Sequence, residues 1–228
     1  MNYIFINYGL PLIALTITLL AQSFVSSSYS RYSKVKNERN MTGKEAARYL
    51  LDKHGLSDID VVKTEGYLTD HYDPSNKVIR LSRNVYNSAS IAAVSVASHE
   101  CGHAIQDKEN YTFLKIRNAL VPIVNFSSYA GYFAILLGLL FGALNLVWLG
   151  IFAEVAILLF QVITLPVEIN ASKRALQELE ANKILNNKEL SQGKTMLTAA
   201  ALTYVASITT TILQVLRLIL MFGRNEEQ

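Results

Sequence analysis

The stretch His99-Glu100-Cys101-Gly102-His103 decides how the rest of the chain is interpreted. Its pattern is H-E-x-x-H. On a helix, residues four apart share one face, so both imidazoles can bind one metal ion. Glu100 would lie close to that metal without binding it, which is where a general base for an attacking water belongs. The motif therefore predicts zinc-assisted hydrolysis, with His99 and His103 as metal ligands and Glu100 as the base.

The residues around the motif predict a helix. Residues 89–101 contain neither Gly nor Pro, and Gly102 is the only weak helix former near the motif. Small apolar residues between Ser90 and Gln106 indicate that this helix is buried. The alternative is a helix with two core histidines whose polar atoms are satisfied by hydrogen bonds, and the motif alone leaves it open.

Apolar stretches of the chain predict four membrane spans. Tyr3 to Val25 carries no charge over 23 residues, and a spanning helix needs about 20. A signal peptide is the alternative there, but the charges expected before its apolar region are absent, which favours a retained anchor. Residues 119–166 are long enough for two spans with a turn at 142–145, where Gly and Asn tolerate turn geometry. Residues 196–222 give the fourth span.

The distribution of positive charge predicts the orientation in the membrane. Of the 21 Lys and Arg residues, 14 lie between Arg31 and Arg117, and five more lie between Lys173 and Lys194. Lys and Arg near the ends of spans favour the cytoplasm. We therefore expect both polar segments inside and both termini outside. The net charge of +3 follows from this bias and indicates no nucleic-acid partner.

A catalytic zinc usually has three protein ligands, so the two histidines need a third partner. The expected topology returns the chain to the cytoplasmic face just before Pro166, and Glu168 is the first carboxylate after that return. Glu168 is thus the predicted third ligand. A simpler role, which is compatible with ligation, is stabilisation of a helix N-terminus. Glu178 and Glu180 are the runners-up, but their charged surroundings favour a solvated helix face.

Several motifs together make the chain resemble the YugP-type family of bacterial membrane zinc metallopeptidases. The resemblance implies that His99, His103 and Glu168 bind zinc and that Glu100 is the base. The chain is also similar, more distantly, to HtpX-type membrane proteases. In those an acidic residue follows the third ligand by four positions, whereas this chain has Ser172 there. The motifs are the N-terminal anchor, residues 42–48, residues 68–74, residues 98–106 and residues 165–168 with Ala171-Ser172.

The segment between the first two spans predicts a small α+β domain. Thr42 and Glu45 form a capping-box pattern for a helix that runs to His54, with Gly55 as its terminator. Short strands are predicted at 60–63, 67–69 and 77–82, with a turn at 73–76. The last strand is predicted to be an exposed edge to which a peptide substrate adds as a further strand.

His71 and Tyr72 are candidates for hydrogen-bond donors to a tetrahedral oxyanion or for substrate contacts. The alternative is that they are surface residues beside a turn. Cys101 is the only cysteine, so no internal disulfide can form, which fits a reducing cytoplasm. We expect it to be small and buried rather than reactive.

Two charges are expected inside the membrane, Glu154 in the third span and Arg217 in the fourth. Charged residues there cost about 3 kcal/mol each on insertion scales and usually find partners. Both fall in the outer half of the bilayer in the expected topology. We therefore predict that they pair, and the alternative is that Arg217 extends to the outer interface.

The expected fold is mainly α, a polytopic membrane protein with four transmembrane helices and a small α+β zincin-like catalytic domain. The expected parts are an anchor at 1–26, a cytoplasmic catalytic domain at 27–118, a two-span hairpin at 119–166, a cytoplasmic helix with the third zinc ligand at 167–195, and a transmembrane helix with a short tail at 196–228.

The expected function is that of a zinc endopeptidase of the gluzincin type at the cytoplasmic face of the bacterial cell membrane, with a role in membrane-protein quality control. Its partners would be a peptide or membrane-protein substrate and the lipid bilayer. An intramembrane protease is disfavoured because Asp107, Lys108 and Glu109 follow the motif closely. A non-catalytic zinc scaffold or chaperone is the alternative from another class, but closed structural zinc sites usually need several cysteines.

Overall fold

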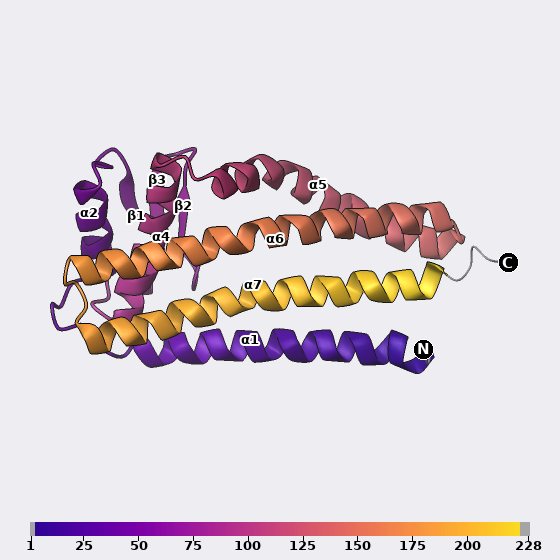
Figure 1. The fold of residues 1–228 in the computed structure, drawn as a ribbon, viewed down its shortest axis with the longest axis horizontal. Coiled ribbons are helices and arrows are strands. Elements are labelled where there is room, and N and C mark those ends of the chain that lie inside the picture. The colour runs from indigo at the N-terminus through magenta and orange to yellow at the C-terminus, as the bar shows by residue number, and fades with distance from the viewer. Residues whose placement is uncertain (1–2, 224–228) are drawn as a thin grey trace. The chain divides into compact units, whose positions relative to one another are not determined.

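The computed structural model describes residues 3–223, and four of its helices are long and apolar enough to cross a membrane (Figure 1). They are α1 at Leu10–Tyr32, which continues from a π-helical turn at Phe5–Gly9, α5 at Thr112–Phe141, α6 at Leu144–Ala181 and α7 at Asn187–Phe222. The prediction of four such helices is confirmed. Gly142 links α5 to α6 with φ +66°, a conformation that glycine adopts without strain, and this confirms the predicted turn.

The chain divides into two compact units, each described separately below. The first contains residues 3–22, 115–166 and 202–223 of the described chain, and the second contains residues 23–114 and 167–201. The second unit holds the three strands, β1 at Asp60–Thr64, β2 at His71–Asp73 and β3 at Val78–Ser82. It also holds the helices α2 at Gly43–Lys53, α3 at Arg83–Tyr86 and α4 at Ile91–Lys108.

Helix α2 begins and ends as predicted. The Thr42 hydroxyl accepts a hydrogen bond from the Glu45 N–H, and the Glu45 carboxylate accepts one from the Thr42 N–H at 2.8 Å. Two N–H groups that have no partner within the helix are thereby satisfied. Gly55, at φ +64°, lies just beyond the helix and turns the chain away.

The order of the strands corrects one prediction. The sheet has the order β1-β3-β2, with β1 parallel and β2 antiparallel to β3. Strand β3 is therefore central, and the prediction that residues 77–82 form an exposed edge is wrong. Strand β2 is the edge strand that contacts α4, through the hydrogen bond from the Tyr72 N–H to Glu100. Register between three short strands depends on long-range packing that strand patterns do not encode.

The predicted strand at 67–69 is also wrong. Gly66 and Leu68 adopt positive φ angles of 102° and 54°, which take the chain out of the extended region. The second strand begins two residues later than its predicted end, at His71. The turn predicted around Asp73 is present, because its carboxylate accepts hydrogen bonds from the N–H groups of Ser75 and Asn76.

The core of the second unit lies between α2, α4, β3 and the C-terminal part of α6. Leu50 and Leu51 of α2 are completely buried, as are Ile79 and Leu81 of β3. Helix α4 is buried along most of its length because small side chains allow neighbours to pack on several faces. This packing fixes the position of the helix that carries the H-E-x-x-H motif.

Helix α6 passes through Pro166 without a break, whereas residues 167–195 were expected to form a separate helix. That segment instead comprises the end of α6, a turn, and the start of α7. Proline removes one hydrogen bond from a helix interior. The continuing helix is stabilised by buried residues spaced four apart on one face, namely Val167, Ala171, Ala175 and Leu179.

The first unit contains a small apolar cluster in which Val147 and Ile151 of α6 pack near Val215 and Leu218 of α7. No ion pair joins Glu154 to Arg217 among the residues that the structure describes, so the prediction that they pair is wrong. The Nε atom of Arg217 is buried without a hydrogen-bond partner. Two residues at similar depth meet only if they lie on facing sides of their helices, and depth along the chain does not determine this.

Candidate metal centre

The second unit brings together the three residues predicted to bind metal. Helix α4 carries His99 and His103 one turn apart, and α6 carries Glu168. The Glu168 Oε2 atom lies 3.3 Å from the His99 Nε2 and 3.6 Å from the His103 Nε2. One potential ligand atom from each residue falls within 4.8 Å of the others. His103 and Glu168 are buried, and His99 is half-buried.

This spacing fits a tetrahedral zinc ion. Zn–N and Zn–O bonds of about 2.0–2.1 Å at tetrahedral angles place neighbouring ligand atoms about 3.3 Å apart. The two measured His–Glu distances lie at or just above that value. The donor set of two imidazoles and one carboxylate is also one that catalytic zinc sites use. Geometry and donor chemistry therefore both fit zinc.

Gly102 allows α4 to approach α6 closely enough to form this cluster. A Cβ atom added at Gly102 would lie 2.5 Å from the carbonyl oxygen of Ala171. No ordinary side chain fits there without moving one helix. Ala171 lies one turn after Glu168, so the contact sets the level on α6 at which Glu168 faces the histidines. From the sequence, Gly102 was expected only to be a weak helix former, so this role was not predicted.

Glu100 is buried beside the cluster. Burial raises the pKa of its carboxyl to about 7, and the nearby Glu168 carboxylate also raises it, while His99 acts against both. The Glu100 Oε2 atom accepts a hydrogen bond of 3.0 Å from the backbone N–H of Tyr72 on β2. A carboxylate with a pKa near neutrality can both take and return a proton, as a general base requires.

The pKa of the Glu168 carboxyl is shifted in the opposite direction to that of Glu100. Burial alone would raise its pKa, but hydrogen bonds and charge interactions with His103 and His99 hold it well below the usual range. It is therefore a permanent anion, as a metal ligand must be. Two carboxylates whose environments separate their pKa values are typical of sites with distinct acid–base roles.

His71 and Tyr72 lie on β2 beside the cluster, but their side chains have other partners. His71 is exposed, and its Nδ1 atom lies 2.8 Å from the carbonyl oxygen of Thr69. The Tyr72 hydroxyl donates to Asp107 at 3.0 Å. Of the two residues, the group that contacts the site is the Tyr72 backbone N–H. Their role toward an oxyanion or a substrate stays a prediction.

Two partners of the histidines were not predicted. The hydroxyl of Ser172 lies 3.1 Å from the Nδ1 of His99, at the position where HtpX-type proteases have an acidic residue. The side-chain oxygen of Gln106 lies 3.0 Å from the Nδ1 of His103. Gln106 is completely buried although it is polar, and this was the signal available in the sequence, since it follows His103 within a buried helix.

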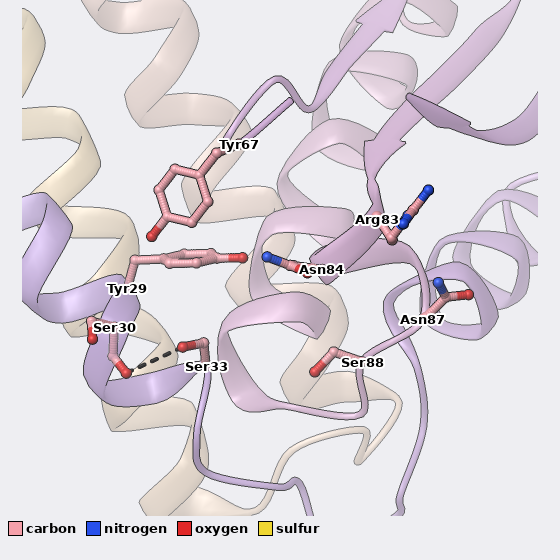
Figure 2. A pocket seen from close by; sticks show the side chains of 8 residues that line it. All are labelled: Tyr29, Ser30, Ser33, Tyr67, Arg83, Asn84, Asn87 and Ser88. Carbon is pink, nitrogen blue, oxygen red and sulfur yellow. Dashed lines mark hydrogen bonds between the residues drawn. The ribbon is translucent and has the colours of Figure 1, made fainter. Parts of the chain in front are cut away.

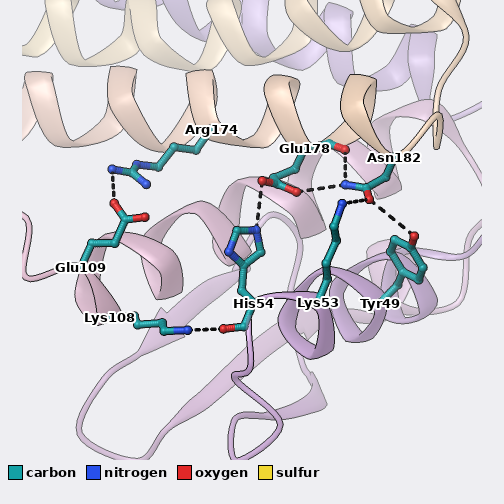
Figure 3. A network of polar contacts seen from close by, with 8 residues as sticks. All are labelled: Tyr49, Lys53, His54, Lys108, Glu109, Arg174, Glu178 and Asn182. Carbon is teal, nitrogen blue, oxygen red and sulfur yellow. Dashed lines mark hydrogen bonds and ion pairs between the residues drawn. The ribbon is translucent and has the colours of Figure 1, made fainter.

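The two runner-up ligands lie elsewhere. The Glu178 carboxylate lies 2.9 Å from the Nε2 of His54 and accepts a hydrogen bond from Asn182 (Figure 3). Glu180 is exposed. In the same network Arg174 contacts Glu109 at 2.7 Å.

The second unit also has an open pocket of about 450 Å³ near the end of α1 (Figure 2). Hydroxyl and amide groups line much of it, Arg83 is its one cation, and none of its lining residues is a His, Cys, Asp or Glu. It therefore lacks the groups that bind metal or move protons at neutral pH. Its eight lining residues are Tyr29, Ser30, Ser33, Tyr67, Arg83, Asn84, Asn87 and Ser88.

Comparison with known proteins agrees with the geometry. The model of a family described as "Putative neutral zinc metallopeptidase" matches residues 8–223. The chain is 46% identical over 219 residues to a protein from Bacillus subtilis (strain 168) named "Putative membrane protease YugP", covering 95% of this chain and 97% of that protein. No solved structure matches the chain. The matches and the four apolar helices identify a multi-pass membrane protein, and the chain belongs to this zinc metallopeptidase family.

Proposed function

We propose that the protein is a membrane-embedded zinc endopeptidase of the gluzincin type that hydrolyses peptide bonds at the cytoplasmic face of the membrane. The observation that carries the proposal is the convergence of His99, His103 and Glu168 beside the buried Glu100. Family membership agrees with it. The second unit, with its motif helix and mixed sheet, is the proposed zincin-like catalytic domain.

Two imidazoles and one carboxylate would hold the ion and leave the fourth position open for water or substrate. When bound, zinc supplies a Lewis acid that polarises a carbonyl group and lowers the pKa of water from about 15.7 to about 7. The low pKa of Glu168 keeps this ligand ionised at neutral pH. Its negative charge partly offsets that of the divalent ion.

Glu100 would take the proton of the attacking water and then deliver it to the leaving amine. Burial raises the pKa of the Glu100 carboxyl, which favours its uptake of a proton from water. The Tyr72 N–H holds one carboxylate oxygen, which leaves the other for the water. The peptide C–N bond breaks as the amine nitrogen receives the proton.

The edge strand β2 is the proposed support for the substrate. An extended peptide beside β2 would use backbone hydrogen bonds to groups other than the Tyr72 N–H, which is bound to Glu100, and would depend little on side-chain sequence. Because β2 contacts α4 through Tyr72 and Glu100, a peptide there would lie beside the base. This arrangement suits broad specificity and replaces β3, which is central in the sheet, as the expected docking edge.

The orientation with both termini outside and the catalytic unit in the cytoplasm follows from the clustering of Lys and Arg between Arg31 and Arg117 and between Lys173 and Lys194. Substrates would be membrane proteins or their cytoplasmic tails, which suits a role in membrane-protein quality control. A reporter that fluoresces only in the cytoplasm, fused to the C-terminus, tests the orientation. Fluorescence from that fusion would contradict it.

Zinc content in the detergent-purified protein is the first test of the metal site. About one zinc per chain is expected in the wild type, and much less in Glu168→Ala. The Glu178→Ala variant is the matched control, because Glu178 lies on the same helix but contacts His54. Full zinc retention in Glu168→Ala would remove Glu168 as a ligand and contradict the proposed centre.

A zinc-binding scaffold without catalysis predicts a different outcome. In that case Glu100→Gln would leave the cellular function intact, whereas a peptidase would lose it and trap its substrate. The single cysteine weighs against a structural zinc site, because such sites are normally closed by four ligands that are mostly Cys.

A further inference from the structure

We infer that Gln106 determines which ring nitrogen of His103 carries the proton, through a chain of hydrogen bonds whose direction is set at Arg174. The inference rests on the metal site proposed above and adds a positioning residue to it. The chain runs from Arg174 on α6 through Asn170 and Gln106 to His103 on α4. Each link is between 2.7 and 3.0 Å.

The direction of the chain follows from groups that can act in only one way. The Nε–H of Arg174 can only donate, so the Asn170 atom 2.7 Å from it must be the amide oxygen. Arg174 is held in place by Glu109, at 2.7 Å (Figure 3). The hydrogen-bond partners of the Asn170 side-chain amide therefore identify which of its two end atoms is the oxygen.

The hydrogen-bond partners of Gln106 determine the orientation of its side-chain amide in the same way. Its Nε2 amide donates to the carbonyl oxygen of Val167 and to the side-chain oxygen of Asn170, each at 2.9 Å. Both of these partners are acceptors, so this end of Gln106 must be the NH₂ group. The Gln106 oxygen then faces the Nδ1 of His103 at 3.0 Å, and an oxygen can only accept there.

His103 must therefore carry a proton on Nδ1. The other nitrogen, Nε2, is the atom that faces Glu168, and it is the one left to supply a lone pair when a metal ion binds. A histidine binds metal through such a lone pair, and a hydrogen bond at the opposite nitrogen orients the ring. Gln106, Asn170 and Arg174 thus prepare His103 for ligation.

The position of the proton on the His99 ring is not determined in this way. Its Nδ1 lies 3.1 Å from the Ser172 hydroxyl, which can either donate or accept. The two histidines of the motif therefore differ, since one is fixed through an amide chain and the other contacts a rotatable group. The Gln106 chain also joins α4 to α6, so it connects the His103 tautomer with the placement of Glu168.

The test uses full-length protein in detergent, labelled with ¹⁵N-histidine, without metal and in alkaline solution. The ¹⁵N chemical shifts of a neutral imidazole show which nitrogen is protonated, and a His103→Asn sample assigns the signal. We expect His103 to be the Nδ1–H tautomer in the wild type. In Gln106→Met, which has similar length and no acceptor oxygen, we expect a mixture of tautomers.

Zinc affinity, measured by competition with a coloured chelator, provides the second readout. Loss of a partner that orients a ligand typically weakens metal binding 10- to 100-fold, and we expect this for Gln106→Met. The matched control is Gln177→Met, the same substitution at an exposed position, for which no change is expected.

A wild-type His103 protonated on Nε2 would overturn the inference, as would equal tautomer populations in the wild type and Gln106→Met. If Gln106→Met fails to fold, as judged by the signals of the other histidines, the tautomer of His103 in the wild type decides the test. Absence of zinc binding in the wild type would count against the proposed function alone, because the tautomer is measured without metal.

Discussion

The two faces of α4 are buried by different means. Toward α2 the helix is apolar, and Cys101 lies completely buried with its Sγ atom 3.6 Å from the carbonyl oxygen of Ala47. Toward α6 it is polar, and His103 and Gln106 make directed hydrogen bonds or face a carboxylate. One helix thus combines an apolar face that packs in the core with a polar face that holds two of the proposed metal ligands.

From this difference we expect that stability and the proposed function can be perturbed separately in this unit. Apolar packing depends on volume and tolerates small changes in shape. Directed hydrogen bonds depend on the chemical identity of each partner, and their loss leaves a buried polar atom unsatisfied. Substitutions on the two faces should therefore give different combinations of unfolding temperature, zinc affinity and catalytic rate.

The largest effect is expected from Glu100→Gln on the polar face. Glutamine has the shape of glutamate but cannot take a proton at neutral pH, so the rate of peptide hydrolysis should fall about 10²- to 10⁴-fold. Zinc content and thermal unfolding should match the wild type, because Glu100 is not a proposed ligand. Cleavage of a labelled membrane-protein substrate in proteoliposomes measures the rate, with a chelator-treated wild type as the zero. Activity within tenfold of the wild type would exclude Glu100 as the base.

Leu51→Ala should have the largest effect on stability. Leu51 is completely buried in the core beside α4, and such truncations cost about 2–5 kcal/mol in the free energy of unfolding. Denaturant titration in detergent measures this cost. The folded fraction should bind zinc as tightly as the wild type does. A zinc affinity reduced more than tenfold in the folded fraction would show that the two faces are coupled.

Gly102→Ala should alter the polar face with less effect on stability. The added methyl group would lie 2.5 Å from the Ala171 carbonyl oxygen, and overpacking of this kind costs about 1–3 kcal/mol. Replacing Gly by Ala in a helix interior adds about 1 kcal/mol to the free energy of unfolding, so the net loss should stay below about 2 kcal/mol. Zinc affinity should nevertheless fall, because Glu168 moves with α6. Unchanged zinc affinity would mean that the close contact does not position Glu168.

Cys101→Ala should have the smallest effect. Cys101 directly precedes Gly102, but it lies on the apolar face of α4. The thiol donates one weak, long hydrogen bond, and burial raises the pKa of the thiol, which disfavours the reactive thiolate. A loss of about 1 kcal/mol in stability is expected, a typical value for a point substitution, with wild-type zinc content and activity. Alkylation of the native wild type by a maleimide should be slow and should leave activity intact. Rapid inactivation would contradict this assignment.

The elements that local sequence determines were predicted well. The capping box at Thr42, the terminator at Gly55 and the turn at Gly142 each depend on one or two residues, and the structure contains all three. The four apolar helices were predicted from length and composition. His99 and His103 were placed on one face from helical spacing alone, and topology with ligand chemistry indicated the Glu168 that the structure brings to them.

Several other features that depend on contacts between distant segments were not predicted. Strand β3 lies in the centre of the sheet, and the three-residue strand β2, which begins at His71, is an edge strand. The role of Gln106 requires Val167 and Asn170, which lie about 60 positions further along the chain. Glu154 and Arg217 show the same limit, because depth in the membrane does not determine which side of a helix a residue occupies.

The hydrogen bond from the Tyr72 N–H to Glu100 makes one amide proton a reporter of the site. That proton exchanges with solvent deuterium only when the strand and the carboxylate separate. Its exchange rate therefore measures how often the base is released from β2. A peptide paired with β2 would change that rate without any chemical label, so occupancy could be followed by mass spectrometry before a substrate is known.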